Sequence, residues 1–147
     1  MIELRPPLIA LALALAARGF DAFVPDWGLF HLSSTKAAPA ISGFGFAIMI
    51  TGWLTFRRLN IAVSPVSAAS ELVTGSIYRF SRNPMYLGLL LILAGIAVAV
   101  GTPPYYLATA AFFIVIDQVF CPYEEGKLSA AFGRQYAAYR NRVRRWL

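Results

Sequence analysis

The sequence predicts an all-α fold: a polytopic membrane bundle of about four transmembrane helices with an amphipathic carboxyl-terminal helix at the interface. Its 147 residues are 59% hydrophobic, whereas soluble domains are about 45–50% apolar. Only 14% are charged, against roughly 25% in soluble domains. The mean hydropathy is +0.62, and the cations gather at the ends of apolar stretches. We therefore predict one integral membrane domain over residues 1–147.

The first predicted span, at about 7–24, is the weakest. Arg18 and Asp21 interrupt it, and the uncharged part before Arg18 is too short to cross about 30 Å of hydrocarbon. We expect the helix to continue past Arg18, whose long side chain reaches toward the interface. The second span, at about 37–56, is twenty residues without a charge, which is the length that a spanning helix needs.

A helical hairpin is predicted for the uncharged run from Asn83 to Ile116. The sequence Gly101-Thr102-Pro103-Pro104 interrupts this run, and proline cannot continue a helix. We expect two short spans at about 85–100 and 105–120, each about 24 Å long at ~1.5 Å per residue. Because the connection is tight, the start of the third span and the end of the fourth must be neighbours.

The tail over 124–147 is predicted to be the amphipathic helix. Its apolar residues recur at helical spacing, which fits a helix on the membrane surface or packed on the bundle. The residues of this stripe are Leu128, Phe132, Tyr136, Tyr139, Val143 and Trp146.

The distribution of charge predicts the orientation. Eleven of the 13 Lys and Arg residues fall in Arg5, in the 57–82 loop and in the tail, which share one side of a four-span bundle. The positive-inside rule then places both termini in the cytoplasm, and we expect a prokaryotic cytoplasmic membrane. The net charge of +6 is thereby explained by the lipid bilayer as partner and not by nucleic acid. With His31 and Cys121 the only residues of their types, no zinc site is expected.

Two polar clusters are expected to meet on the cytoplasmic side: Arg82-Asn83-Pro84 before the third span, and Glu124-Glu125 after the fourth. Together they suit a cationic, amphipathic cofactor such as S-adenosylmethionine. Carboxylates accept bonds from ribose hydroxyls or an ammonium group, whereas arginine and asparagine hold a carboxylate. An aromatic face such as that of Tyr86 suits a sulfonium.

The segment from Tyr78 to Gly88 includes Arg82-Asn83-Pro84-Met85-Tyr86-Leu87-Gly88, and the tail from Glu124-Glu125 to Val143 includes Phe132-Gly133. The first resembles the motif R-[HN]-P-x-Y-x-G. The second resembles E-E-x-x-L-x-x-x-F-G-x-x-Y-x-x-Y-x-x-x-V. Both motifs are typical of the isoprenylcysteine carboxyl methyltransferase and phospholipid methyltransferase superfamily. The resemblance covers about 72–147, and the chain looks like a short prokaryotic-type member.

The resemblance implies S-adenosylmethionine-dependent methyl transfer, with S-adenosylhomocysteine as product, to a lipophilic acceptor from the bilayer. The acceptor classes that we consider are an isoprenoid, a phospholipid, and a small thiol or carboxylate. No catalytic residue is identified, but Glu125 and Arg134 are candidates. Many members have His at the position of Asn83, and Asn cannot act as a base near neutral pH. The residues expected to bind the cofactor are Arg82, Asn83, Pro84, Tyr86, Gly88, Glu124 and Glu125.

Some features have two interpretations. Gly88 and Gly95 lie seven residues apart, which fits either helix packing through small residues or close approach of a cofactor. Asp117, near the end of the fourth span, is either a functional acid or the partner of an interfacial arginine. Three other functions stay open for the whole chain: a small four-span transporter, a membrane scaffold without catalysis, and a reductase of the related sterol reductase branch.

Overall fold

The computed structural model describes residues 5–24, 33–34, 36–59 and 71–147, and their regular structure is entirely helical. Three helices are long and apolar enough to cross a membrane: Pro6–Phe23, Ala37–Arg58 and Pro103–Phe132. A fourth, Pro84–Val100, is equally apolar in character but shorter, with 17 residues. The predicted fold class, a polytopic helical membrane bundle, is confirmed. His31 lies outside the described residues.

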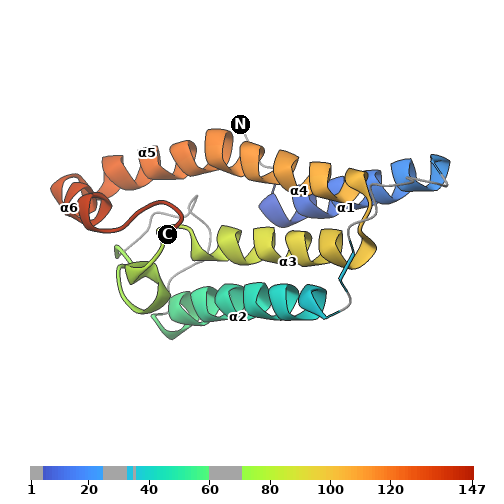
Figure 1. Cartoon of the computed structure of the whole chain (residues 1–147). Helices are drawn as coiled ribbons and strands as arrows, with labels where there is room; N and C mark the ends of the chain where they lie inside the picture. The colour runs from blue at the N-terminus through green and yellow to red at the C-terminus, as the bar shows by residue number, and fades with distance from the viewer. Residues whose placement is uncertain (1–4, 25–32, 35, 60–70) are drawn as a thin grey trace.

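The helices are arranged around α3 (Pro84–Val100), which lies between α2 (Ala37–Arg58) and a long rod that contains α4 (Pro103–Val115) and α5 (Cys121–Phe132) (Figure 1). Consecutive spanning helices alternate in direction. They therefore bring the start of α1 (Pro6–Phe23), the end of α2 and the start of α3 to one end of the bundle. We call this the arginine end, because it carries Arg5, Arg57, Arg58, Arg79 and Arg82.

The packing of α2 on α3 depends on glycines. A methyl group added to Gly45 would lie 2.6 Å from the carbonyl oxygen of Gly88, and one added to Gly88 would lie 2.5 Å from that of Gly45. Gly52 and Gly95 make similarly close approaches one heptad further along. Small residues let two helix backbones approach closely within a bilayer, where there is no hydrophobic drive for helices to associate. Of the two interpretations of Gly88 and Gly95, the structure supports helix packing.

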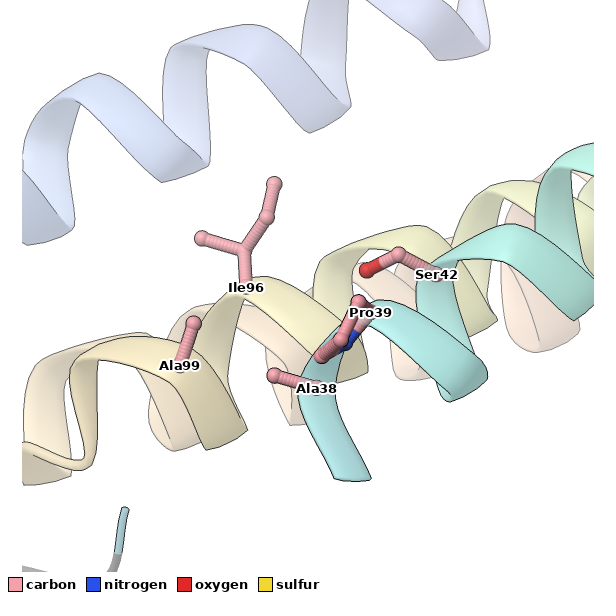
Figure 2. A pocket seen from close by; sticks show the side chains of 6 residues that line it. Ala38, Pro39, Ser42, Ile96 and Ala99 are labelled. Carbon is pink, nitrogen blue, oxygen red and sulfur yellow. The ribbon is translucent and has the colours of Figure 1, made fainter. Parts of the chain in front are cut away.

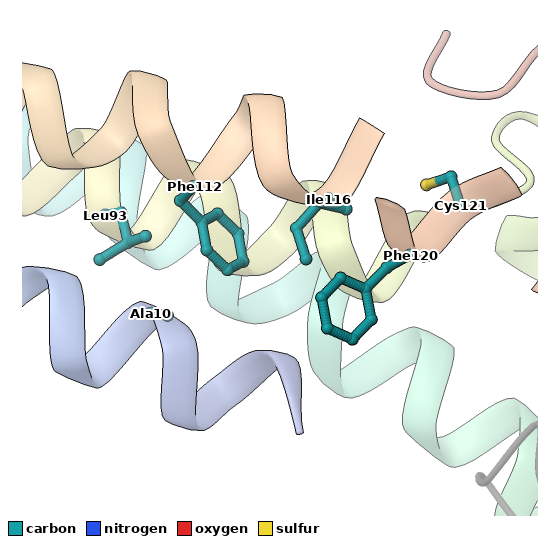
Figure 3. Close-up of a cluster of buried hydrophobic side chains, with 6 residues drawn as sticks. All are labelled: Ala10, Leu93, Phe112, Ile116, Phe120 and Cys121. Atoms are coloured by element: carbon teal, nitrogen blue, oxygen red, sulfur yellow. The ribbon is translucent and has the colours of Figure 1, made fainter. Parts of the chain in front are cut away.

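A second interface joins α1, α3 and α4 (Pro103–Val115). Its largest cluster joins Ala10, a small residue of α1, with Phe112 and Phe120 (Figure 3). Both phenylalanines are almost completely buried. The rest of α1 turns Leu8, Leu11 and other large apolar side chains outward, as expected for a helix that faces lipid. The remaining buried members of this cluster are Leu93, Ile116 and Cys121.

The helix that contains the fourth predicted span does not end near residue 120. Instead, α4 continues through a π-helical turn, Ile116–Phe120, into α5 (Cys121–Phe132), and forms one rod of 30 residues. The ring of Pro122 would clash with the carbonyl of Gln118 in a regular α-helix, and the wider π turn just before it avoids that clash. At ~1.5 Å per residue the rod is about 45 Å long, so its last third extends beyond a hydrocarbon core of about 30 Å.

The single tail helix predicted over 124–147 is also wrong, because the tail is divided at Gly133. That residue adopts a φ of +47°, which favours glycine and ends the α-helix. The chain then forms α6 (Arg134–Arg142) and a final non-helical stretch that returns between α5 and the start of α3 (Figure 1). The predicted stripe nevertheless faces inward, since Tyr136, Tyr139 and Val143 are buried with Leu128 and Phe132 packed on them.

A shallow groove lies at the end of the bundle opposite the arginine end (Figure 2). It is formed by the start of α2 and the last turns of α3, and it offers one side-chain hydroxyl, that of Ser42, among small apolar groups. Its lining residues are Ala38, Pro39, Ser42, Gly95, Ile96 and Ala99.

The glycine interface gives a matched pair of substitutions on one helix. Gly45→Ala should lower the free energy of unfolding by about 1–3 kcal/mol, because the added methyl group forces α2 and α3 apart. Gly43→Ala meets nothing within 4 Å and should be neutral or stabilising by up to about 1 kcal/mol, because alanine favours helix. Unfolding by SDS titration in mixed micelles measures both, and equal effects would contradict this packing.

Candidate functional site

The candidate site lies at the arginine end, where the start of α3, the α5 helix and the chain after α6 meet. A short 3-10 helix, Ser76–Arg79, leads into this point, and Asn83 precedes Pro84, the first residue of α3. Proline suits a first helical turn, since its missing N–H would have no partner there. The backbone N–H of Arg82 donates to the carbonyl of Arg144 at 3.0 Å, so the returning chain fixes the segment that starts α3.

The predicted meeting of the two polar clusters is confirmed by an ion pair. An Nη1–Oε1 distance of 3.1 Å joins Arg82 to Glu125, and each side chain is only 10% exposed. The same Nη1 donates to the hydroxyl of Tyr136 at 3.2 Å. The Nε of Arg82 is buried and has no hydrogen-bond partner among the described residues. Buried polar groups are normally satisfied, so this nitrogen is an exception within the cluster.

A second arginine, Arg145, was not among the predicted site residues. Its guanidinium makes a bidentate, forked pair with Glu125, in which Nε lies 2.9 Å from Oε1 and Nη2 lies 3.0 Å from Oε2. Its Nη1 lies 3.0 Å from Oδ1 of Asp117, which also accepts a bond from the indole of Trp146 at 2.9 Å. Of the two interpretations of Asp117, the structure therefore shows the arginine pair. The hydrogen bonds with Glu125 raise the pKa of Arg145 above its usual range, so this arginine stays charged.

The remaining carboxylate, Glu124, has a different environment. It accepts a hydrogen bond from the hydroxyl of Tyr86, and no described cation lies within ion-pair distance of it. The nearby Lys127 stacks on Tyr123, with its Nζ 4.5 Å from the ring centroid. Burial raises the pKa of Glu124, whereas the hydrogen bond from Tyr86 and the charge of Lys127 act in the opposite direction. Arg82 and Arg145 pair with two other carboxylates of the cluster, so Glu124 is the carboxylate that has no ion pair among the described residues.

Buried tyrosines lie beside the polar cluster. The hydroxyl of Tyr139 donates to the backbone carbonyl of Tyr78 at 2.6 Å and so joins α6 to the 3-10 helix. Burial raises the pKa of Tyr139 to about 12 and raises those of Tyr78 and Tyr136 as well. These phenols are therefore neutral near pH 7: the hydroxyl of Tyr139 donates a hydrogen bond, whereas that of Tyr136 accepts one from Arg82.

The structure brings most of the predicted site residues together, but not all. The amide Nδ2 of Asn83 donates to the carbonyl of Arg145 at 3.4 Å, and Pro84 is buried at the start of α3. Gly88, in contrast, packs against α2. Arg134 is exposed at the start of α6 and makes no ion pair with any described residue. Both therefore lie outside the cluster.

Arg145 and Trp146 were not predicted as site residues because both were assigned to one continuous amphipathic helix. The only available signal was Asp117, an acid in an apolar span that required a cation, and no sequence pattern identified which tail arginine it was. Their role follows from the break at Gly133, which lets the chain turn back toward the bundle.

Comparison with known proteins decides the family. Residues 36–135 match the family described as phospholipid methyltransferase, and this range includes both polar clusters. The chain belongs to the phospholipid methyltransferase family. Within this family's range lie Arg82, Asn83, Tyr86, Glu124 and Glu125, whereas Arg145 lies beyond it.

Individual relatives agree with the family. The chain is 33% identical over 116 residues to protein-S-isoprenylcysteine O-methyltransferase B of Arabidopsis thaliana, covering 70% of this chain and 57% of the plant protein. It is 38% identical over 76 residues to a probable protein-S-isoprenylcysteine O-methyltransferase of rice, covering 50% and 38%. An uncharacterized protein of Haemophilus influenzae is 41% identical over 63 residues, covering 43% of this chain and all of that one.

The chain thus spans about half the length of the plant methyltransferases that it matches. No solved structure matches it.

Removing the shared carboxylate should destabilise the fold. Glu125→Gln leaves Arg82 and Arg145 without the charge that both contact, and breaking a buried ion pair from one side costs about 3–5 kcal/mol. Because Arg145 is 27% exposed, we expect on the order of 3 kcal/mol. Thermal unfolding in detergent measures the loss. The exposed Glu71→Gln is the control, and an equal loss in both variants would contradict this assignment.

The buried tyrosines should make the free energy of unfolding fall at high pH. A pKa raised to about 12 in the folded protein, from about 10 in an unfolded chain, means that folding favours the neutral phenol of Tyr139. Its contribution is complete below about pH 10 and is lost as pH rises through about 12. Phenolate absorbance and the free energy of unfolding, both measured against pH, follow this loss of stability. In Tyr139→Phe the contribution of this phenol to the loss should be absent. An unchanged alkaline profile in the variant would contradict it.

Proposed function

We propose that the chain is an integral membrane methyltransferase that uses S-adenosylmethionine at the arginine end. The family match supports methyl transfer. The charge of the cluster supports the cofactor, and it is the observation on which the proposal rests. S-adenosylmethionine carries a sulfonium, an ammonium and a carboxylate, and so has one net positive charge. Glu124 is a carboxylate that makes no ion pair with any described residue, although the charge of Lys127 acts on it from nearby.

Glu124 and Tyr86 form the cationic half of the proposed binding site. The carboxylate of Glu124 suits the ammonium or the ribose hydroxyls, and the Tyr86 hydroxyl already holds one of its oxygens in place. The aromatic rings of Tyr86 and Tyr123 can face the sulfonium, since a cation is attracted to the face of an aromatic ring. Tyr86 is partly buried and Tyr123 is exposed, so both side chains remain accessible.

Arg82 supplies the complementary half. Its unpartnered, buried Nε suits the carboxylate of the cofactor, because charge-assisted hydrogen bonds to carboxylates are among the strongest that a protein makes. Asn83 is adjacent and donates to a backbone carbonyl. An amide is sufficient here, since the position holds a group and does not need to take up a proton.

When bound, S-adenosylmethionine would supply an electrophilic methyl group. The residues of the chain then have to align donor and acceptor and exclude water, which accounts for large rate gains without a covalent intermediate. Glu125 has both oxygens engaged by arginines, so we assign it to positioning. Arg134 is exposed and apart from the cluster, so we assign it no catalytic part. A carboxylate or thiolate acceptor needs no base.

The acceptor that we propose is lipophilic. The plant relatives are named for isoprenylcysteine and the family for phospholipid, and the site lies where the α4–α5 rod leaves the hydrocarbon core. An isoprenylated thiol compound bearing a carboxylate and a phospholipid are therefore the first acceptors to test. We further propose that the arginine end faces the cytoplasm, because cytoplasmic membrane faces are enriched in arginine and lysine.

Calorimetric titration of the detergent-purified protein tests the cofactor. Wild type should bind S-adenosylmethionine and S-adenosylhomocysteine in the micromolar range. Glu124→Gln should weaken binding of the cationic donor at least about tenfold, or roughly 1.4 kcal/mol. It should weaken binding of the product to a similar extent, since the product keeps the ammonium group and the ribose hydroxyls that we assign to Glu124. Glu71→Gln serves as the surface control.

The absence of binding for both ligands in folded wild-type protein would contradict the proposal and favour the transporter or scaffold interpretation. If the donor binds, transfer of a radiolabelled methyl group to farnesylcysteine derivatives, phosphatidylethanolamine and small thiols identifies the acceptor class. Labelled product extracted into the lipid phase is the expected result.

A further inference from the structure

A strap formed by residues 143–146 connects the parts of the polar cluster. Its backbone accepts three hydrogen bonds from the start of α3. Besides the N–H of Arg82 on Arg144, the hydroxyl of Ser81 donates to the Arg145 carbonyl at 3.1 Å and the amide of Asn83 donates to it at 3.4 Å. Ser81 is almost completely buried, so the strap covers the segment that carries Arg82.

The side chains of the strap reach the opposite wall of the cluster. All three guanidinium nitrogens of Arg145 are used, two on Glu125 in α5 and the third on Asp117 in the π turn. Trp146 donates to the same Asp117 oxygen and packs against Phe113, with ring centroids 5.3 Å apart. A forked pair fixes the plane of a carboxylate as well as its distance, so Arg145 determines how Glu125 faces Arg82.

We propose that Arg145 is a positioning residue for donor binding: through Glu125 it sets the place of Arg82, and through the strap it holds the start of α3 against α5. The ligand in this inference comes from the proposed function, whereas the geometry does not depend on it. Glu125 shares Oε1 between Nη1 of Arg82 and Nε of Arg145. Without Arg145, the carboxylate is free to rotate toward Arg82 and to occupy the nitrogen that we assign to the donor.

A double-mutant cycle tests whether Arg145 acts through Glu125. Arg145→Gln should weaken S-adenosylmethionine binding about tenfold, and it should have little further effect in the Glu125→Gln background, because coupled residues are not additive. Arg145→Lys keeps the charge but loses the fork, and it should recover binding only in part. Arg142→Gln, an exposed neighbour on α6, is the control and should bind normally.

Several outcomes would overturn the proposal. One is unchanged donor affinity in Arg145→Gln protein that remains folded, even if its thermal stability falls, since that result indicates a purely structural role. Another is full additivity with Glu125→Gln.

Hydrogen exchange of ligand-free protein provides a readout that needs no donor. Amides of residues 81–83 and 117–125 should exchange faster in Arg145→Gln than in Arg142→Gln, and equal exchange would overturn the proposed geometry. If wild type binds no donor while exchange changes as expected, the proposed function fails and the positioning of Glu125 and Arg82 stands.

Discussion

The arrangement of the site depends on one carboxylate, that of Glu125, which is shared by two arginines. Arg82, Glu125 and Arg145 come from three separate segments, and their charged groups meet within hydrogen-bond distance at a place that is largely removed from water. A charge in such a place is tolerated only when it is paired and its remaining lone pairs are satisfied. The start of α3, the α5 helix and the end of the chain are therefore constrained to one geometry.

The bundle beneath makes this meeting possible. Glycine contacts hold α3 close against α2, and small residues of α1 accept the aromatic side chains of α4. The extra length of the α4–α5 rod carries Glu124 and Glu125 past the expected hydrocarbon core, to a level where polar ligands and lipid are both within reach.

The division of charge within the cluster separates two kinds of carboxylate. Asp117 and Glu125 are matched by Arg145 and Arg82, so they organise the site. Glu124 has a tyrosine partner and no ion pair among the described residues, and it is therefore the carboxylate that we propose for a cationic ligand. Adjacent residues in the sequence therefore have different roles, because successive positions on a helix face different neighbours.

The sequence by itself determined the apolar helices, the hairpin and the meeting of two motifs, because long apolar runs and a double proline leave a membrane chain few alternatives. It did not determine where the fourth helix ends, because the helix passes Pro122 through a π turn and continues. It also did not indicate that Arg145 returns to Glu125 and Asp117, or that Gly88 faces α2 and not a ligand. Those outcomes depend on which surfaces pack together, and long-range packing leaves no local pattern in the chain.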